Sequence, residues 1–329
     1  MSNDIREKVQ QDALDAVLKH KRATAAVSMG VGKTLIGLKY IEHFQDNTDG
    51  ELRVLVVAPK LSIFQTWVDE SKKFNIKIPN IEFTTYISLN KHDCQKYDVV
   101  ILDECHNLLK SHLPFLGCYT GRILGLTGTP PRYIKSEKGQ MVNKFCPVVF
   151  NYITDEAVES NILNDYRIIV HRLKLSTSST IAVKTKNKDF YTSELKNYQY
   201  WTSRIAESTT KKQEQIASIM RMKALMDFRT KEDYAKKLFS EIEDKCILFC
   251  NTQAQADKLC DYSYHSSNED SEHNLDLFKK DKIDKLSCVL QLNEGVNIPN
   301  LRAGIIMHSY GNERKASQRI NIPVLYKFL

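Results

Sequence analysis

The sequence contains no apolar run long enough to cross a membrane. Its longest apolar stretches, such as residues 54–58 and 99–102, are far shorter than the ~20 residues that a transmembrane helix needs. The N-terminus carries charged residues where a signal peptide would need an apolar segment. We therefore expect a cytoplasmic protein without a membrane partner, located in the host cytoplasm if the gene is viral.

A Cys-x-x-Cys pair is also absent, although the sequence has eight cysteines. Several of them lie in apolar segments, as Cys246 and Cys250 do in the stretch Cys-Ile-Leu-Phe-Cys. Cysteines in such places are typically buried free thiols. A metal site is the alternative, and the scattered spacing argues against it.

Low-complexity tracts are absent as well. With 42% hydrophobic and 26% charged residues, the composition is typical of a globular protein rather than a disordered or fibrous one. A length of 329 residues suggests two domains, each able to bury its own core. The net charge of +7 favours a polyanionic partner such as nucleic acid only slightly, because many proteins without such a partner are as basic.

Short apolar segments alternate with amphipathic ones in both halves of the chain. Alternation of this kind predicts an α/β fold with two tandem, doubly wound parallel-sheet domains. We expect a first domain at 1–155, a connection with helices at 156–243, and a second domain at 244–329 that lacks its C-terminal end. The pattern predicts helices at 5–20, 34–44, 63–74 and 254–261, and strands at 23–28, 53–59, 81–86, 99–102, 123–126, 245–250, 287–292 and 302–309.

A glycine-rich segment follows the first predicted strand. Its two glycines allow backbone N–H groups to close on phosphate oxygens, Lys33 can neutralise the β- and γ-phosphates, and Thr34 can bind Mg²⁺. The full form of this phosphate-binding motif has a glycine where Val27 stands, and a chance match is the alternative. The strand before it and the helix after it favour an ATP site. Its residues are Met29, Gly30, Val31, Gly32, Lys33 and Thr34.

Two adjacent carboxylates end the apolar segment 99–102. In a parallel sheet, the residues at the carboxyl end of a buried strand reach the ligand crevice. Asp103 would then hold Mg²⁺, and Glu104 would orient and deprotonate the attacking water. A strand that simply ends in a solvated acidic turn is the alternative, and the phosphate loop upstream argues against it.

The ordered set of motifs resembles that of superfamily 2 helicases and translocases over nearly the whole chain. The sequence Asp-Glu-Cys-His at 103–106 resembles their DEAH-type box. The motifs are most similar to those of the DNA-handling branch that includes phage UvsW-type helicases and the motor subunits of restriction enzymes. The resemblance implies two RecA-like domains, with ATP and Mg²⁺ as cofactors and nucleic acid, with DNA favoured, as the partner.

The resemblance also implies roles for residues of the first half. Gln10 resembles the glutamine that reads adenine, and Thr127, Gly128 and Thr129 resemble the motif that couples ATP state to strand movement. Lys60, Thr85 and Arg132 are the candidate contacts to nucleic acid, although each has an ordinary structural alternative. Trp67 and Trp201 could stack on bases, but the helical spacing of Trp67 favours a core position.

In the second half, residues 245–251 resemble the strand that opens the second motor domain, and residues 264–266 follow at a suitable distance. Gly295 and Asn297 resemble the fifth motif, which lies between nucleotide and nucleic-acid backbone. Gln318 and Arg319 resemble the start of the sixth motif and would face the γ-phosphate, in a catalytic role.

The sixth motif departs from the family pattern after Arg319. Asn321 stands at the glycine position, and Ile322 and Leu325 stand at the two arginine positions. An arginine that reaches the phosphoryl group is worth about 10³ to 10⁵ in rate. The motif set as a whole implies ATP-driven translocation on, or unwinding of, nucleic acid, with DNA favoured. The alternative is a nucleotide-gated nucleic-acid-binding protein with weak turnover, unless Lys327 or a partner protein supplies the missing charge.

A P-loop kinase or transferase would share the phosphate loop, but it would not explain the repeated second half. The sequence indicates no protein partner. It leaves open the choice of DNA or RNA, the direction of movement, the preferred substrate structure and the oligomeric state.

Overall fold

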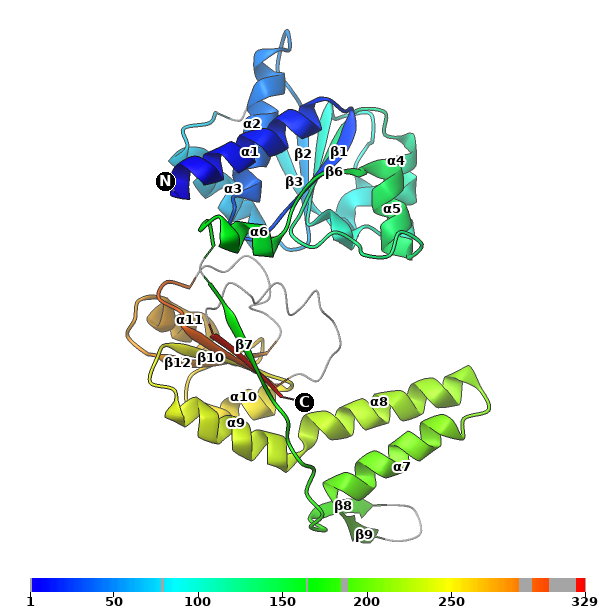
Figure 1. The fold of residues 1–329 in the computed structure, drawn as a ribbon. Helices are drawn as coiled ribbons and strands as arrows, with labels where there is room; N and C mark the ends of the chain where they lie inside the picture. The colour runs from blue at the N-terminus through cyan, green and yellow to red at the C-terminus, as the bar shows by residue number, and fades with distance from the viewer. Residues whose placement is uncertain are drawn as a thin grey trace. The chain divides into compact units, whose positions relative to one another are not determined.

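A computed structural model shows two compact units, which divide between Asp165 and Tyr166. Each unit is built on a parallel sheet with helices, so the predicted α/β fold is confirmed (Figure 1). No helix within the described part of the chain is both long and apolar enough to span a lipid bilayer. The structure describes residues 2–77, 80–163, 165–184, 189–289, 298–307 and 324–328.

The sheet of the first unit has the strand order β3-β2-β4-β5-β1-β6, and all neighbouring strands are parallel. The pairing of Ala58 with Thr85 and of Asp103 with Leu126 brings the carboxyl ends of four strands to one edge. The strands are β1 (Arg22–Val27), β2 (Val54–Ala58), β3 (Ile81–Thr85), β4 (Val99–Asp103), β5 (Arg122–Thr127) and β6 (Val148–Tyr152).

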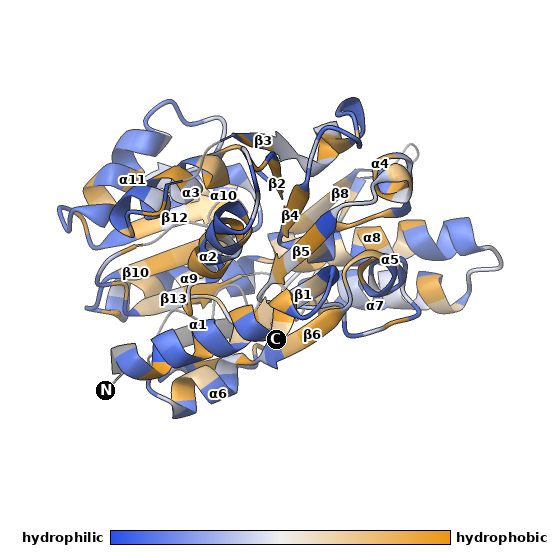
Figure 2. Ribbon diagram, turned by 90° about the horizontal axis from the view of Figure 1, so that it is seen from above, coloured by the Kyte–Doolittle hydropathy of each residue, from blue (hydrophilic) through white to orange (hydrophobic). Residues whose placement is uncertain are grey.

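Helices cover both faces of this sheet, because alternate residues of the strands point to opposite faces and both sets are apolar in β2 and β4. Val56 and Ile101 pack into one core with α1, α2 and α3, whereas Val57 and Leu102 pack into a second core with α4 and α5. The central strands β2 and β4 are accordingly apolar along nearly their whole length (Figure 2). The helices are α1 (Ser2–Leu18), α2 (Lys33–Asp46), α3 (Ser62–Lys73), α4 (Leu113–Cys118), α5 (Glu137–Phe145) and α6 (Thr154–Glu159), with short 3-10 helices η1 (Tyr86–Lys91), η2 (Cys105–Asn107) and η3 (Lys110–His112).

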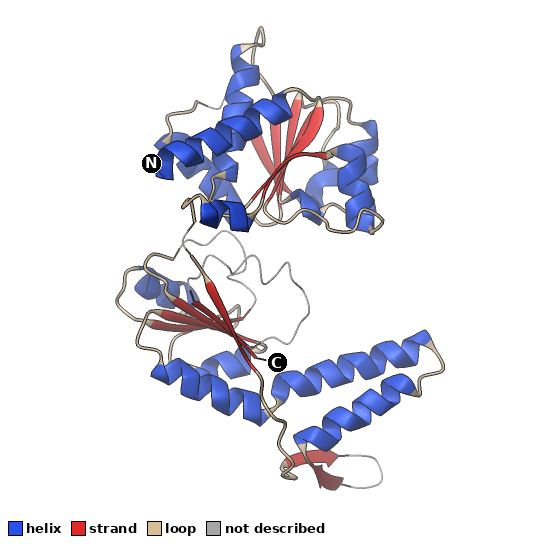
Figure 3. Cartoon of the chain, viewed as in Figure 1, coloured by secondary structure: helices blue, strands red, loops and turns tan. Residues whose placement is uncertain are grey.

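The second unit has a parallel sheet of order β11-β12-β10-β13-β14-β7. A hairpin of two long helices, α7 and α8, projects from this unit next to the antiparallel pair β8–β9 (Figure 3). The strands are β7 (Arg167–His171), β8 (Ile181–Lys184), β9 (Asp189–Thr192), β10 (Cys246–Cys250), β11 (Ser263–Tyr264), β12 (Lys285–Val289), β13 (Ala303–Ile306) and β14 (Val324–Phe328). The helices are α7 (Glu194–Ala206), α8 (Lys211–Asp227), α9 (Arg229–Glu241), α10 (Gln253–Leu259) and α11 (Ser271–Lys279).

Two features of the chain differ from the expectations. The segment 156–243 includes β7, which is an edge strand of the second sheet, in addition to helices. Cys94 and Cys118 are joined by a disulfide bond with their Cα atoms 6.2 Å apart, so the expectation of free thiols is wrong for this pair. Both lie outside the apolar strands on which that expectation rested. The free thiols of Cys105, Cys146, Cys246, Cys250 and Cys288 are buried as expected.

Candidate nucleotide site

The phosphate loop connects β1 to the N-terminus of α2, in the order that the sequence predicts. Gly30 and Gly32 have φ angles of +84° and +108°, which favour glycine. A Cβ atom on Gly32 would lie 2.5 Å from Nε2 of Gln10. Both the backbone conformation and the space around the loop therefore require glycine at position 32.

Gln10 lies on α1 and is buried against this loop. Its Nε2 donates a hydrogen bond of 2.6 Å to the carbonyl oxygen of Val31. A contact between the glutamine and the loop backbone was not part of the sequence expectation. It fixes the loop at the point where the phosphates of a nucleotide would bind.

Lys33 and Glu104 form an ion pair at the carboxyl edge of the sheet. Nζ of Lys33 donates to Oε1 of Glu104 at 2.7 Å, and both side chains are only 12% exposed. Burial alone would lower the pKa of Lys33, but the charges of Glu104 and Asp103 raise it above its ordinary value. Burial alone would raise the pKa of Glu104, but Lys33 and His106 hold it well below its usual range. Both side chains are therefore charged at neutral pH.

Asp103 is buried beside this pair, at the end of β4. Its Oδ2 accepts a hydrogen bond of 3.0 Å from Nε1 of Trp67, and its backbone carbonyl accepts one of 2.8 Å from the hydroxyl of Tyr86. Burial, together with the adjacent charge of Glu104, raises the pKa of Asp103 to about 6. Trp67 is fully buried, as its helical spacing indicates, and it also bonds to Asp103, a contact that the spacing could not reveal.

The residues of the predicted coupling motif join the same network. Nδ1 of His106 lies 2.8 Å from Oγ1 of Thr127 and 3.2 Å from Oε2 of Glu104. The backbone N–H of Thr129 donates to Oγ1 of Thr127 at 3.1 Å. A Cβ on Gly128 would lie 3.2 Å from Nζ of Lys33, so the motif passes directly over the lysine. Hydrogen bonds thus connect the end of β5 to the phosphate loop through Glu104.

These residues fit a Mg²⁺-bound nucleoside triphosphate. The loop glycines leave room for phosphate oxygens, and α2 adds the positive end of a helix. Oγ of Ser28, at the base of the loop, is buried and has no hydrogen-bond partner among the described residues. Thr34 is half-buried in the first turn of α2, so its hydroxyl and the carboxylate of Asp103 are the candidate Mg²⁺ ligands.

The described residues contain no group of three or more His, Cys, Asp or Glu side chains that could hold a metal. Mg²⁺ in nucleotide sites is commonly held by one or two protein ligands together with substrate phosphates. Thr34 and Asp103 would supply such a pair of protein ligands.

The candidate nucleic-acid contacts of the first unit lie at the same edge of the sheet. Lys60 follows β2 and is half-exposed, Thr85 ends β3 and is half-buried, and Arg132 follows β5 and is exposed. Parallel strands with aligned ends place such residues on one side of the sheet.

Several predicted site residues of the second unit lie outside the described residues. They are Gly295, Asn297, Gln318, Arg319, Asn321 and Ile322. Leu325 is described and lies in β14, where it is in register with Gly304 of β13 and Ile168 of β7. One of the two positions matched to the missing arginines is therefore part of the second sheet.

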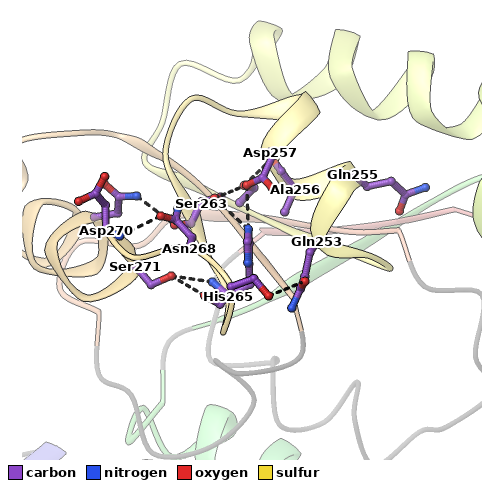
Figure 4. Close-up of polar contacts among 12 residues, drawn as sticks. Gln253, Gln255, Ala256, Asp257, Ser263, His265, Asn268, Asp270 and Ser271 are labelled. Atoms are coloured by element: carbon purple, nitrogen blue, oxygen red, sulfur yellow. Dashed lines mark hydrogen bonds and ion pairs between the residues drawn. The ribbon is translucent and has the colours of Figure 1, made fainter.

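The segment 264–266 takes part in a polar network (Figure 4). Nε2 of His265 lies 2.8 Å from Oδ1 of Asp257, which also accepts a bond of 2.6 Å from Oγ of Ser263. Oγ of Ser271 donates to the carbonyl of His265 at 2.6 Å. These bonds join the loop after β11 to the neighbouring helices α10 and α11.

Two protein-family models match the chain. One, described as the res subunit of type III restriction enzymes, matches residues 5–85, and the other, the helicase conserved C-terminal domain, matches residues 230–321. The first match lies in the first unit, and the second match lies in the second unit. The two units have the fold of tandem RecA-like helicase domains.

Known proteins resemble the chain at low identity. The DNA 3'-5' translocase XPB2 of Sulfurisphaera tokodaii is 21% identical, and the match covers 94% of this chain and 76% of the relative. The structure of the helicase domain of Pyrococcus furiosus Hef has a TM-score of 0.55 at 12% identity and covers 99% of this chain and 94% of its own.

A third similar structure is that of the ATP-dependent type ISP restriction-modification enzyme LlaBIII bound to DNA. It has a TM-score of 0.61 at 14% identity, and the match covers 98% of this chain. The chain spans only 27% of the length of that enzyme. At these identities, the two solved structures support the fold alone.

Proposed function

We propose that the chain is an ATP-driven translocase or helicase that acts on DNA. The observation that carries the proposal is the connected group at the carboxyl edge of the first sheet, in which Glu104 contacts Lys33, His106 and Thr127. A single network thereby joins the phosphate loop, the paired carboxylates and the coupling motif. An isolated nucleotide-binding fold would not need the third of these.

Each residue has a distinct role in the proposed reaction. Lys33 neutralises the β- and γ-phosphates, Thr34 and Asp103 hold Mg²⁺, and Glu104 orients and deprotonates the attacking water. When bound, Mg²⁺ offsets the negative charge that the phosphate oxygens carry. Because Lys33 is paired with Glu104, phosphates that attract Lys33 would free the carboxylate to act as the base.

DNA is the proposed substrate, because one similar protein is described as a DNA translocase and another as an enzyme bound to DNA. We further assign the chain to the DEAH-type, DNA-handling branch, on the form of the Asp-Glu-Cys-His sequence at 103–106. Contacts through phosphates should make binding insensitive to sequence and sensitive to salt.

A nucleotide-gated DNA-binding protein with slow turnover is the second candidate. It is favoured by Ile322 and Leu325, which stand where the family has arginines.

The first test compares ATP hydrolysis with and without single-stranded DNA. For a motor, we expect DNA to stimulate turnover, Lys33→Ala to weaken ATP binding, and Glu104→Gln to bind ATP while losing at least ~100-fold in turnover. Unchanged turnover in Glu104→Gln would contradict the proposed role of the carboxylate.

A strand-displacement assay separates the two candidates. A helicase separates a tailed duplex when ATP is added, whereas a gated binding protein retains ATP and DNA without separating strands. The double variant Asn321→Gly, Ile322→Arg restores part of the family pattern. Equal and fast turnover by this variant and the unmodified chain would show that the arginine positions do not limit the reaction.

A further inference from the structure

Helix α8 of the second unit has an exposed face that carries large apolar side chains. Ile216, Ile219 and Met220 are 52%, 47% and 37% exposed, and their spacing places them on one face of the helix. Two lysines and an aspartate, all exposed, extend this face in both directions along the helix. The face, here called the α8 stripe, consists of Lys212, Ile216, Ile219, Met220, Lys223 and Asp227.

Helix α7 covers the other side of α8. The two helices form the hairpin that projects from the second unit (Figure 1). Nη1 of Arg221 in α8 donates to Oγ1 of Thr202 in α7 at 3.4 Å, and its guanidinium lies 5.7 Å from the ring centre of Tyr198. Ala217, one turn before Arg221, is buried on the same side. Packing within the hairpin therefore leaves the α8 stripe uncovered, and an exposed apolar surface of this kind usually marks an interaction site.

The charges of the α8 stripe are placed symmetrically about its apolar centre. Lys212 lies seven residues before Ile219, and Asp227 lies seven residues after Met220. A second α8 that runs antiparallel, with a twofold axis between Ile219 and Met220, would therefore place Lys212 of each copy opposite Asp227 of the other. The aliphatic stem of Lys223 would cover Ile216 at both ends of the apolar centre. A parallel pair would instead place like charges opposite each other, which is unfavourable.

The charged ends of the stripe are available for such pairs. Neither Lys212 nor Asp227 forms an ion pair with another residue that the structure describes. Partial burial and the charge of Glu232 raise the pKa of Asp227 above its ordinary value, whereas Lys223 lowers it. A further cation opposite Asp227 would therefore stabilise its ionised carboxylate.

The mixture of charges favours a second copy of the chain over nucleic acid as the partner. A polyanion would be held by cations along the whole stripe, but Asp227 places a negative charge at one end. An unrelated protein would not require the two ends of the stripe to complement each other, whereas a twofold interface uses the same surface of both copies and does require it.

We propose that two copies of the chain associate through an antiparallel pair of α8 helices. Ile219 and Met220 of both copies lie at the centre of this interface, and Lys212 pairs with Asp227 at both ends. The association requires neither ATP nor nucleic acid.

Sedimentation of the full chain, treated with nuclease and free of nucleotide, tests the proposal. The stripe is small, so we expect a dimer with a Kd on the order of 10 µM. Ile219→Glu brings two carboxylates together near the twofold axis and should weaken the dimer at least about tenfold. The position is exposed, so the variant should keep the thermal unfolding midpoint of the unmodified chain. Tyr191→Ser is the matched control, because Tyr191 is 70% exposed in β9 of the same unit, and it should dimerise as the unmodified chain does.

Two charge reversals test the antiparallel register. Asp227→Lys leaves the stripe with a lysine at both ends, and Lys212→Asp leaves it with an aspartate at both ends. Each variant by itself should dimerise about fivefold more weakly, because like charges then face each other. A mixture of the two variants should form a heterodimer about as tight as the unmodified dimer, because opposite charges meet again at both ends.

Several results would overturn the proposal. They are a chain that stays monomeric at about 100 µM, well above the expected Kd, a dimer that Ile219→Glu leaves intact, a mixture that pairs no better than its separate components, and a dimer that forms only when an oligonucleotide is added. A monomeric chain with DNA-stimulated ATP hydrolysis would remove the dimer and leave the motor proposal. A dimer without ATP hydrolysis would do the reverse.

Discussion

Asp103 and Glu104 are adjacent in sequence but have opposite electrostatic surroundings. Glu104 is paired with Lys33, whereas the buried carboxylate of Asp103 accepts the indole N–H of Trp67 and faces the charge of Glu104. The pKa of Asp103 is therefore raised to about 6, and that of Glu104 is lowered. The fold therefore favours the ionised form of Glu104 and disfavours that of Asp103, which a bound cation would stabilise.

This difference predicts opposite effects of two isosteric substitutions on stability. The pKa of Asp103 is higher in the folded chain than in the unfolded chain. The protonated side chain therefore stabilises the folded chain, and this stabilisation is lost as the pH rises through about 6. Asp103→Asn should therefore stabilise the metal-free chain at pH 7.5 by about 2 kcal/mol, with the gain disappearing near pH 4. The measurement is the urea unfolding midpoint across this pH range, without nucleotide or Mg²⁺.

Glu104→Gln is the matched control. The pKa of Glu104 is lower in the folded chain than in the unfolded chain. Its ionised side chain therefore stabilises the folded chain at any pH above the unfolded pKa, and this stabilisation is lost as the pH falls through the folded pKa. At pH 7.5, the substitution should destabilise the chain by about 3 kcal/mol, because it leaves Lys33 buried without its carboxylate. If both substitutions stabilised the chain at pH 7.5, or both destabilised it, the electrostatic surroundings of Asp103 and Glu104 would not differ as described.

At the scale of elements, α2 and α3 meet where a glycine faces a tryptophan. A Cβ on Gly37 would lie 2.4 Å from the Trp67 ring and 3.1 Å from Leu126. This close approach lets Trp67 reach Asp103 from α3. The contact between the two helices thus fixes the position of a proposed Mg²⁺ ligand.

Replacing Gly37 with alanine tests this contact. Alanine favours a helix by about 1 kcal/mol over glycine, but overpacking typically destabilises by about 1–3 kcal/mol. We expect overpacking to dominate, so Gly37→Ala should lower the unfolding midpoint and weaken Mg²⁺-dependent nucleotide binding. Gly117→Ala in α4 is the control, because its added Cβ would have no neighbour within 4 Å. If both variants were stabilised, the helix contact would be looser than the structure indicates.

The sequence predicted the strands that are buried on both faces, whereas β7 and β14 of the second sheet were missed. The segments that form β2, β4 and β10 are continuous apolar runs, and their burial makes the pattern unambiguous. β7 was missed because it is an edge strand with mostly exposed side chains. β14 was missed because Leu325 was matched to a motif position rather than to an apolar strand pattern.

The residues of the phosphate loop and the paired carboxylates could be found because their chemistry dictates their types and order. The contacts that hold these residues in place could not be predicted from the sequence. The bond from Trp67 to Asp103 joins residues 36 positions apart, and the bond from Gln10 to Val31 joins residues 21 apart, so both depend on tertiary packing. The sequence also could not reveal that Ile87 is exposed, because its exposure depends on the path of η1 after β3.

At the scale of the whole molecule, each unit has its own sheet and its own cores. The described residues of the candidate nucleotide site all belong to the first unit. The second unit depends on β14, which lies between β13 and β7 and contributes Tyr326 to the core. Damage to β14 should therefore separate the stability of the second unit from nucleotide binding by the first.

Tyr326→Pro provides this test, because proline removes a ladder hydrogen bond from a central strand and the aromatic contact with His171 is lost. We expect proteases to cleave the second unit while residues 1–165 persist and still bind ATP. Loss of nucleotide binding together with the second unit would mean that the first unit does not fold by itself.

The position of β14 also sets the order of events during synthesis. The first unit is complete once residue 165 has left the ribosome, whereas β7, made immediately afterwards, lacks its neighbour until residues 324–328 have been made. At about 5–20 residues per second, that interval is on the order of ten seconds. During it, β7 presents an unpaired edge to the cell, so nascent chains should need chaperone protection at this strand and not in the nucleotide-binding half.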